Sequence, residues 1–216
     1  MHIYAFGSVC RGEVSRNSDV DLLALVDGRD ARFDPNKYSI YSYSKIAILW
    51  SQGSPFAWHL MLESRLLFAS DGLNFLQSLG QPAPYTHCVR DCEKFFGVFC
   101  TARSSLAENS MSRVFDLSAI FLSVRNIATC FALGVLGAPN FSRHAALTLG
   151  GEFVLPLSPN CYRILERSRI LSTRSSGADI SEQEFSIAVS EFEMIDEWMK
   201  DLMAKAREHE RVLQPR

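Results

Sequence analysis

Acidic residues are missing from one long stretch of this 216-residue chain, since none lies between Asp34 and Glu63. The chain also has little net charge: 22 Lys and Arg nearly balance 24 Asp and Glu, which gives −2 at pH 7. Charge therefore does not indicate a broad nucleic-acid surface, although a local basic site stays open. Hydrophobic residues at 47% and charged residues at 21% exclude a disordered chain and fit one compact domain or two small ones.

Long apolar runs are scarce as well. The longest, such as AIFLSV and CFALGVLGA, are too short and too interrupted to span a bilayer. The first residues, MHIYAFGS, contain neither a basic segment nor a long apolar segment, so no signal peptide is predicted. We therefore expect a cytoplasmic protein without a membrane partner.

Cysteine usage does not indicate a disulfide framework. The six cysteines lie in apolar or helical-looking segments, which favours buried, reduced thiols: Cys10, Cys88, Cys92, Cys100, Cys130 and Cys161. Cys88 and Cys92 would share one face of a helix, and His87 precedes them. No second pair of ligands follows at zinc-finger spacing, so we predict no zinc site.

The first eighty residues alternate between strand and helix signals. Strands are predicted at HIYAF, at DVDLLALV from Asp19 to Val26, at YSIYSYS from Tyr38 to Ser44, and at RLLFAS. A short helical turn is predicted at SVCRGE, and helical residues broken at Gly53-Ser54-Pro55 precede the last strand. This order predicts a small α/β domain over residues 1–80.

After a linker at residues 80–86 the pattern becomes helical, which predicts a second domain over 87–212. Long helices are expected at 87–106, 113–136 and 181–210. Ser181 and Glu184 predict a capping box at the start of the third. One core-facing stripe is predicted along it, made of Phe185, Val189, Phe192, Ile195, Met199 and Leu202.

Two carboxylates stand at the start of the second predicted strand. Alternate residues of a strand point to the same face, so Asp19 and Asp21 would face the same way. Two like charges repel unless a cation lies between them, and Mg²⁺ binds one or two carboxylates together with substrate phosphates. The pair therefore predicts a divalent metal site.

A phosphate site is predicted next to it. Gly7 and Ser8 end the first strand, where glycine permits close approach of the backbone and the following turn offers amides to an anion. Arg11 and Arg16 would add positive charge, although either can equally be a solvated side chain. Together these residues predict a nucleoside triphosphate held by its phosphates against a metal ion.

The segment GS…RGE…SDVDLLALV resembles the signature of the nucleotidyltransferases of the DNA polymerase β superfamily, particularly the small bacterial ones. The resemblance implies a small mixed-sheet catalytic domain, followed here by an α-helical bundle domain. It implies that Gly7 and Ser8 position the triphosphate, with Arg11 and Ser18 beside them. Asp19 and Asp21 would be catalytic and would bind the metals.

The implied activity is Mg²⁺- or Mn²⁺-dependent transfer of a nucleoside monophosphate from a triphosphate, ATP by preference, to a hydroxyl. The acceptor stays open between a small molecule such as an aminoglycoside, a protein side chain and an RNA end. The segment GSPFAWHLMLESRLLFAS is also similar to the end of the catalytic domain in some members.

This chain departs from the family pattern in two ways. Members usually carry a helix before the first strand, and its absence here suggests either packing in a homodimer or a misplaced start. The family also takes a third carboxylate from the next strand, but Tyr38–Ser44 contains none. We therefore predict one tightly bound metal, a weak second one and slow transfer, which an Asp at Ser39 or Ser42 would speed up. The alternative is a nucleotide-binding pseudoenzyme that acts through a partner in a toxin–antitoxin or phage-defence module.

Other polar residues allow weaker interpretations. RNIATC, with Arg125 and Asn126, resembles the Arg-Asn-x-x-x-His motif of HEPN ribonucleases, but Cys130 replaces the histidine and is a poor acid–base group. His59 lies among apolar neighbours and is interpreted as a hydrogen-bonded core histidine. Several basic residues of the second domain would face phosphate or form solvated ion pairs: Arg143, His144, Arg167, Arg169 and Arg174.

Overall fold

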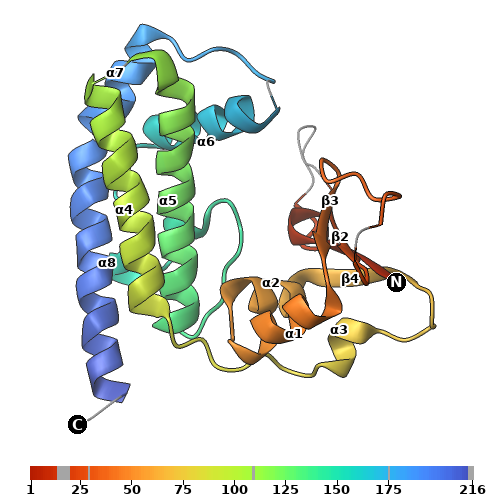
Figure 1. Cartoon of the computed structure of the whole chain (residues 1–216). Coiled ribbons are helices and arrows are strands. Elements are labelled where there is room, and N and C mark those ends of the chain that lie inside the picture. The colour runs from red at the N-terminus through yellow and green to blue at the C-terminus, as the bar shows by residue number, and fades with distance from the viewer. Residues whose placement is uncertain (14–19, 29, 109, 175, 214–216) are drawn as a thin grey trace. The chain divides into compact units, whose positions relative to one another are not determined.

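The computed structural model describes residues 1–216 apart from 14–19, 29, 109, 175 and 214–216. The chain divides into two compact units, Met1–Thr86 and His87–Arg216. Figure 1 shows the elements of both units along the chain. The first unit is a small mixed sheet with helices and the second is helical, which confirms the predicted fold class.

The sheet of the first unit has four strands in the order β3-β2-β1-β4. Its strands are β1 (His2–Phe6), β2 (Asp21–Leu25), β3 (Tyr38–Tyr41) and β4 (Ser64–Ala69). β1 pairs antiparallel with both β2 and β4, whereas β2 pairs parallel with β3. The central strand β1 therefore has a neighbour on either side, and the Gly-Ser turn at its end lies beside the start of β2.

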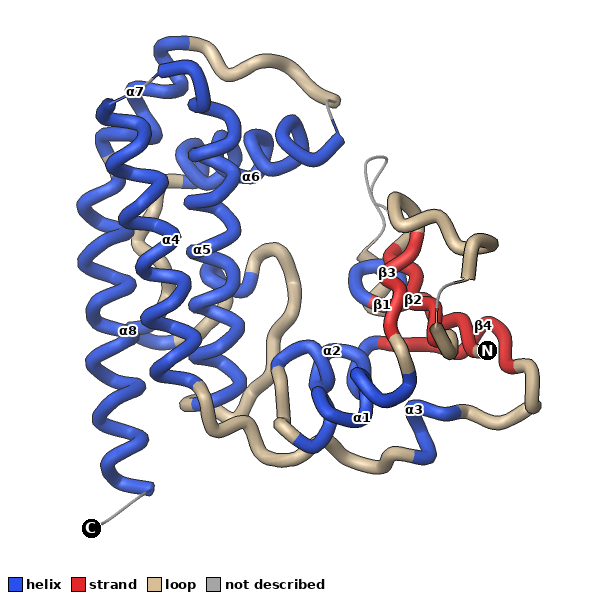
Figure 2. The backbone as a smooth tube through the Cα atoms, viewed as in Figure 1, coloured by secondary structure: helices blue, strands red, loops and turns tan. Residues whose placement is uncertain are grey.

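Helices cover one face of this sheet (Figure 2). They are α1 (Tyr43–Ser51), α2 (Pro55–Glu63) and the short α3 (Phe75–Ser78). Ser42 and Ser54 accept hydrogen bonds from the backbone amides of Lys45 and Ala57 and so cap α1 and α2. Side chains of β1 and β2 pack on these helices in one core, which includes Tyr4, Phe6, Leu23, Leu25, Ile46, Trp50 and Leu60.

Two predicted strand limits are wrong. The strand expected over 38–44 ends at Tyr41, because Ser42 is the N-cap of α1. Its hydroxyl accepts a hydrogen bond from the Lys45 amide. The strand expected from Asp19 begins at Asp21, and Asp19 lies outside the described residues. Tyr38 and Ile40 pack with Ala24 and Val26 on the sheet face away from the helix core.

The segment predicted as a linker is attached to the first unit. The indole of Trp50 donates a hydrogen bond to the carbonyl of Gly80 at 2.9 Å, and the indole of Trp58 donates to the carbonyl of Ala83 at 3.1 Å. The backbone of this segment therefore lies against the turn between α1 and α2.

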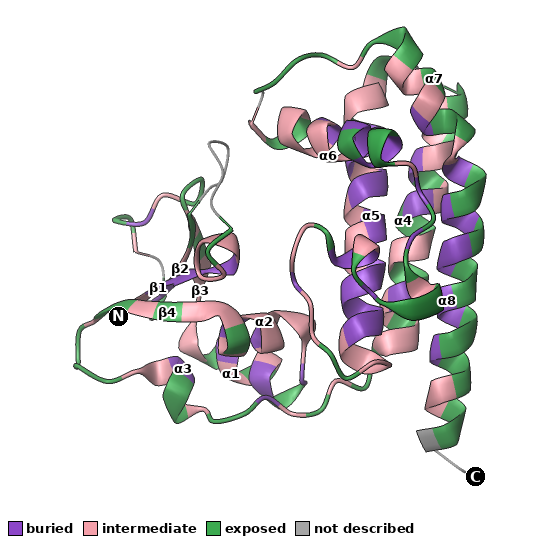
Figure 3. Ribbon diagram, turned by 180° about the vertical axis from the view of Figure 1, so that it is seen from behind, coloured by how far each residue is buried: buried purple, intermediate pink, exposed green. Residues whose placement is uncertain are grey.

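The second unit consists of helices with short 3₁₀ turns between them. Its helices are α4 (Cys88–Glu108), α5 (Arg113–Gly134), α6 (Pro159–Arg174), α7 (Glu182–Ser190) and α8 (Phe192–Leu213). α5 packs on α4 and α6, and buried residues run along its length (Figure 3). Among the described residues, α5 alone is long and apolar enough to cross a membrane, and 67% of its apolar window is buried in the protein.

The predicted helix over 181–210 is two helices, and α6 was not predicted. The capping box of Ser181 and Glu184 is present at the start of α7. The chain breaks at Glu191, whose carboxylate accepts hydrogen bonds from the Ser158 amide at 2.8 Å and the Ser158 hydroxyl at 2.5 Å. The break changes the helical phase, so Val189 is 42% exposed, while Ile195 and Met199 are fully buried as predicted.

Candidate functional site

The Gly-Ser turn is held in a tight conformation by its own backbone. Gly7 directly follows β1 and has φ +75°, a left-handed value that favours glycine. Its carbonyl accepts hydrogen bonds from the amides of Cys10 at 3.0 Å and Arg11 at 3.3 Å, and the Ser8 carbonyl accepts from Glu13 at 2.9 Å. The turn is therefore a defined loop that brings the predicted residues Gly7, Ser8 and Arg11 close together.

Asp21 lies directly against this turn. It is the first residue of β2 and pairs with Phe6, the residue before Gly7. A Cβ atom placed on Gly7 would lie 2.8 Å from Oδ2 of Asp21 and 3.8 Å from Nε2 of His59. Only a residue without a side chain fits here, so the Gly7 backbone lies directly against the Asp21 carboxylate, with the His59 imidazole close by.

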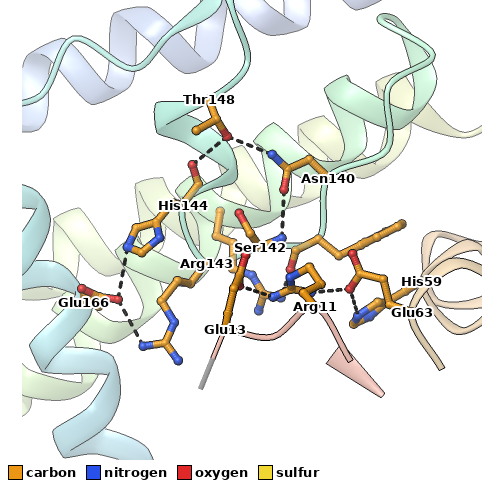
Figure 4. Close-up of polar contacts among 12 residues, drawn as sticks. Arg11, Glu13, His59, Glu63, Asn140, Ser142, Arg143, His144, Thr148 and Glu166 are labelled. Atoms are coloured by element: carbon orange, nitrogen blue, oxygen red, sulfur yellow. Dashed lines mark hydrogen bonds and ion pairs between the residues drawn. The ribbon is translucent and has the colours of Figure 1, made fainter. Parts of the chain in front are cut away.

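A cluster of charged side chains, which we call the Glu63 cluster, lies on the α2 side of the turn. It consists of Arg11, Glu13, His59 and Glu63 (Figure 4). The Arg11 guanidinium donates through Nη1 to Oε2 of Glu63 and through Nη2 to Oε2 of Glu13, the latter at 2.8 Å. Nε2 of His59 lies 3.0 Å from the same oxygen of Glu63. Glu63 therefore contacts both Arg11 of the turn and His59 of its own helix.

Because Arg11 and Glu63 of this cluster are largely buried, the charges beside them shift the pKa of both groups. The side chains of Arg11, His59 and Glu63 are only 19%, 13% and 14% exposed. Burial alone would raise the pKa of Glu63, but the hydrogen bond and charge of His59 and the charge of Arg11 outweigh it and hold that pKa below its ordinary value. Burial alone would lower the pKa of Arg11, yet its bonds to Glu13 and Glu63 keep that pKa above its usual range.

Two of these residues were not recognised as site residues from sequence. His59 was interpreted as a core histidine; it is largely buried and lies 3.0 Å from Glu63, but it also lies next to Gly7. Glu63 was noted only as the end of the stretch without acidic residues. Their spacing of four residues puts both on one face of α2, and this spacing is the signal that would have paired them.

The remaining predicted site residues, Ser18 and Asp19, lie outside the described residues, as does Arg16. In the part of the chain that is described, no three His, Cys, Asp or Glu side chains are grouped as a metal site. The donor beside Gly7 nevertheless suits a hard divalent cation, because the exposed Asp21 carboxylate supplies oxygen ligands.

The candidate residues of the helical unit already have partners. Arg125 donates to the carbonyl of Phe141 at 3.0 Å, and Cys130, at the position of the HEPN histidine, is buried. Arg143 and His144 both lie near Glu166, at 3.3 and 3.6 Å.

The other predicted sites of this unit are engaged in the same way. Arg167 pairs with Glu184 at 2.6 Å. The sulfurs of Cys88 and Cys92 are 4.0 Å apart, and all the cysteines named above are free thiols.

Comparison with known proteins identifies the first unit. Residues 2–71 match the family model described as a nucleotidyltransferase domain, and this range runs from the start of β1 to the end of the sheet. No curated protein matches the chain. The match and the mixed sheet show that the chain carries a nucleotidyltransferase domain at its N-terminus, followed by a helical unit, which is consistent with a nucleotidyltransferase of the DNA polymerase β type.

Proposed function

We propose that the protein transfers a nucleoside monophosphate from a nucleoside triphosphate, ATP by preference, to a hydroxyl on a small molecule, a protein or an RNA. The observation that carries this proposal is the close contact at Gly7, where a tight backbone turn meets the carboxylate of Asp21. Gly7 and Ser8 would hold the phosphates through the turn, and Asp21 together with Asp19 would hold Mg²⁺ or Mn²⁺.

In this reaction the acceptor oxygen attacks the α-phosphorus and forms a new phosphoester bond. The bond between the α-phosphorus and its bridging oxygen breaks, pyrophosphate leaves, and the hydroxyl proton passes to solvent or to a base. A bound divalent ion supplies charge neutralisation for the phosphates. The turn at Gly7 orients the triphosphate for this attack, because its backbone is fixed by the hydrogen bonds of the Gly7 and Ser8 carbonyls.

One observation favours a second candidate, a nucleotide-binding pseudoenzyme that acts through a partner. β3 carries Ser39 on the same face as Asp21, where the family resemblance implies a carboxylate. A hydroxyl is a weak ligand for a metal that activates a nucleophile. In this case the domain binds nucleotide and metal but transfers slowly or not at all, as in the toxin–antitoxin or phage-defence modules considered above.

The test uses the full chain with α-labelled NTPs, Mg²⁺ or Mn²⁺, and cell extract, and follows label on protein, RNA and small molecules. Asp21→Asn and Asp19→Asn should each abolish labelling and weaken Mg·ATP binding measured by calorimetry. Asp30→Asn is the matched control, because Asp30 pairs only locally with Arg32 on the surface of the same unit. Unchanged binding and labelling in Asp21→Asn would overturn the proposal, whereas intact binding by the wild-type protein without labelling would support the pseudoenzyme.

A further inference from the structure

The arginine of the Gly-Ser turn bonds to two carboxylates through Nη1 and Nη2 of its guanidinium. Arg11 lies four residues after Gly7, and its backbone amide bonds back to the carbonyls of Gly7 and Ser8. Its guanidinium bonds to Glu13 within the turn and to Glu63, 52 residues further along the chain. The turn is therefore connected to the end of α2 through one side chain.

We propose that Glu63 is a positioning residue of the nucleotide site, and that Arg11 acts as its partner in bracing the turn rather than as a ligand of the triphosphate. This inference rests on the proposed function for its consequence in nucleotide binding. Glu63 holds the Gly7–Ser8 turn through Arg11 and lies 3.0 Å from Nε2 of His59, the imidazole next to Gly7. One carboxylate therefore contacts both the turn and the histidine beside it.

The burial of the Arg11–Glu63 pair explains why Arg11 should stay bound to Glu63 when a nucleotide binds. Its side chain is 19% exposed, and a guanidinium that left Glu63 for a phosphate would leave a largely buried carboxylate with His59 as its remaining charged neighbour among the described residues. Removing one partner from a buried charge pair is strongly unfavourable, because the other charge stays desolvated. The pair therefore acts as a fixed support, and the phosphate contacts fall to the backbone of the turn.

The two roles of Arg11 predict opposite results for Glu63→Gln. If Glu63 braces the turn, this variant weakens binding of Mg²⁺ and α,β-methylene-ATP, on the order of tenfold or more, as for other residues that orient ligands. Arg11→Met should weaken binding similarly, and the double variant should be no worse than either single one. The charge exchange Arg11→Glu with Glu63→Arg should recover most of the lost affinity. If Arg11 is a phosphate ligand, Glu63→Gln frees it and leaves the affinity equal or tighter, which would overturn the inference.

Two further measurements separate this inference from the proposed function. Amide hydrogen exchange of Cys10–Glu13 should become faster in Glu63→Gln even without nucleotide, while exchange in the sheet stays slow; unchanged exchange in the turn would overturn the inference.

The second measurement is Mn²⁺ binding to Glu63→Gln without nucleotide, followed by electron paramagnetic resonance. The affinity should stay as in the wild type, because its loss would make Glu63 a metal ligand instead. If the wild-type protein binds no nucleotide, the proposed function fails, and the exchange result alone decides the role of Glu63. Asp30→Asn again serves as the control for removing one carboxylate from an arginine pair.

Discussion

Gly7 and Asp21 lie so close that a Cβ on the glycine would be 2.8 Å from the carboxylate oxygen. Gly7→Ala should therefore displace the Asp21 carboxylate, with loss of Mg·ATP binding measured by calorimetry. The left-handed backbone adds a stability cost of about 1–2 kcal/mol. Gly72→Ala is the matched control. Gly72 has φ +74°, and a Cβ added to it would meet no atom within 4 Å apart from its chain neighbours, so this variant has the backbone strain without the close contact. Equal nucleotide binding in the two variants would contradict this account of the site.

A second prediction concerns the missing carboxylate. Asp21, Leu23 and Ser39 share the sheet face that meets the helices, and Ser39 is paired in register with Leu23. Ser39→Asp should place a carboxylate near Asp21 and raise Mn²⁺ affinity and the rate of nucleotide transfer. Ser42→Asp, which the sequence alone also suggested, serves as the control instead, because Ser42 lies beyond β3 and caps α1, and an aspartate there keeps the cap. A faster reaction with Ser42→Asp but not with Ser39→Asp would show that this face does not meet the metal.

A third prediction concerns the attachment of residues 80–84. Gly53 has φ +60°, and a Cβ on it would lie 2.2 Å from the Ala83 carbonyl oxygen and 2.4 Å from that of Pro84. Gly53→Ala should cost about 3 kcal/mol or more, because backbone overlap adds to the left-handed strain. Gly80→Ala has a similar φ of +67° without a close neighbour and should cost only about 1–2 kcal/mol. Urea unfolding of both variants measures the difference, and equal costs would show that the chain moves aside easily.

A fourth prediction concerns acid stability. Hydrogen bonds from Arg167, and then from the Ser181 backbone, lower the pKa of Glu184 from 4.5 to about 2. A carboxylate with a depressed folded-state pKa stabilises the fold above its unfolded pKa and loses that contribution as pH falls through the folded value. Glu184→Gln should therefore be less stable than the wild type at pH 6, and the difference should shrink between about pH 4.5 and pH 2. Urea midpoints at several pH values measure it, and a difference independent of pH would contradict the assignment.

Local sequence signals predicted much of the fold. β1, the break before Pro55 and the capping box at Ser181 were all predicted, because each depends on a few neighbouring residues. The break at Glu191 was missed, because its reason is a hydrogen bond to Ser158, which is distant in sequence. The site divides in the same way. Gly7 and Asp21 follow from a motif, whereas the role of Glu63 depends on α2 folding back onto the turn.

The bond between Glu191 and Ser158 has a consequence for the order of folding. The Ser158 hydroxyl accepts a hydrogen bond from the Cys161 amide at the start of α6. The same hydroxyl donates a hydrogen bond to Glu191, at the end of α7, which fixes the position of the serine. During synthesis α6 leaves the ribosome before the residue that secures its first turn. Its start therefore becomes stable only when the α7–α8 junction has arrived, so these three helices should form together rather than one after another.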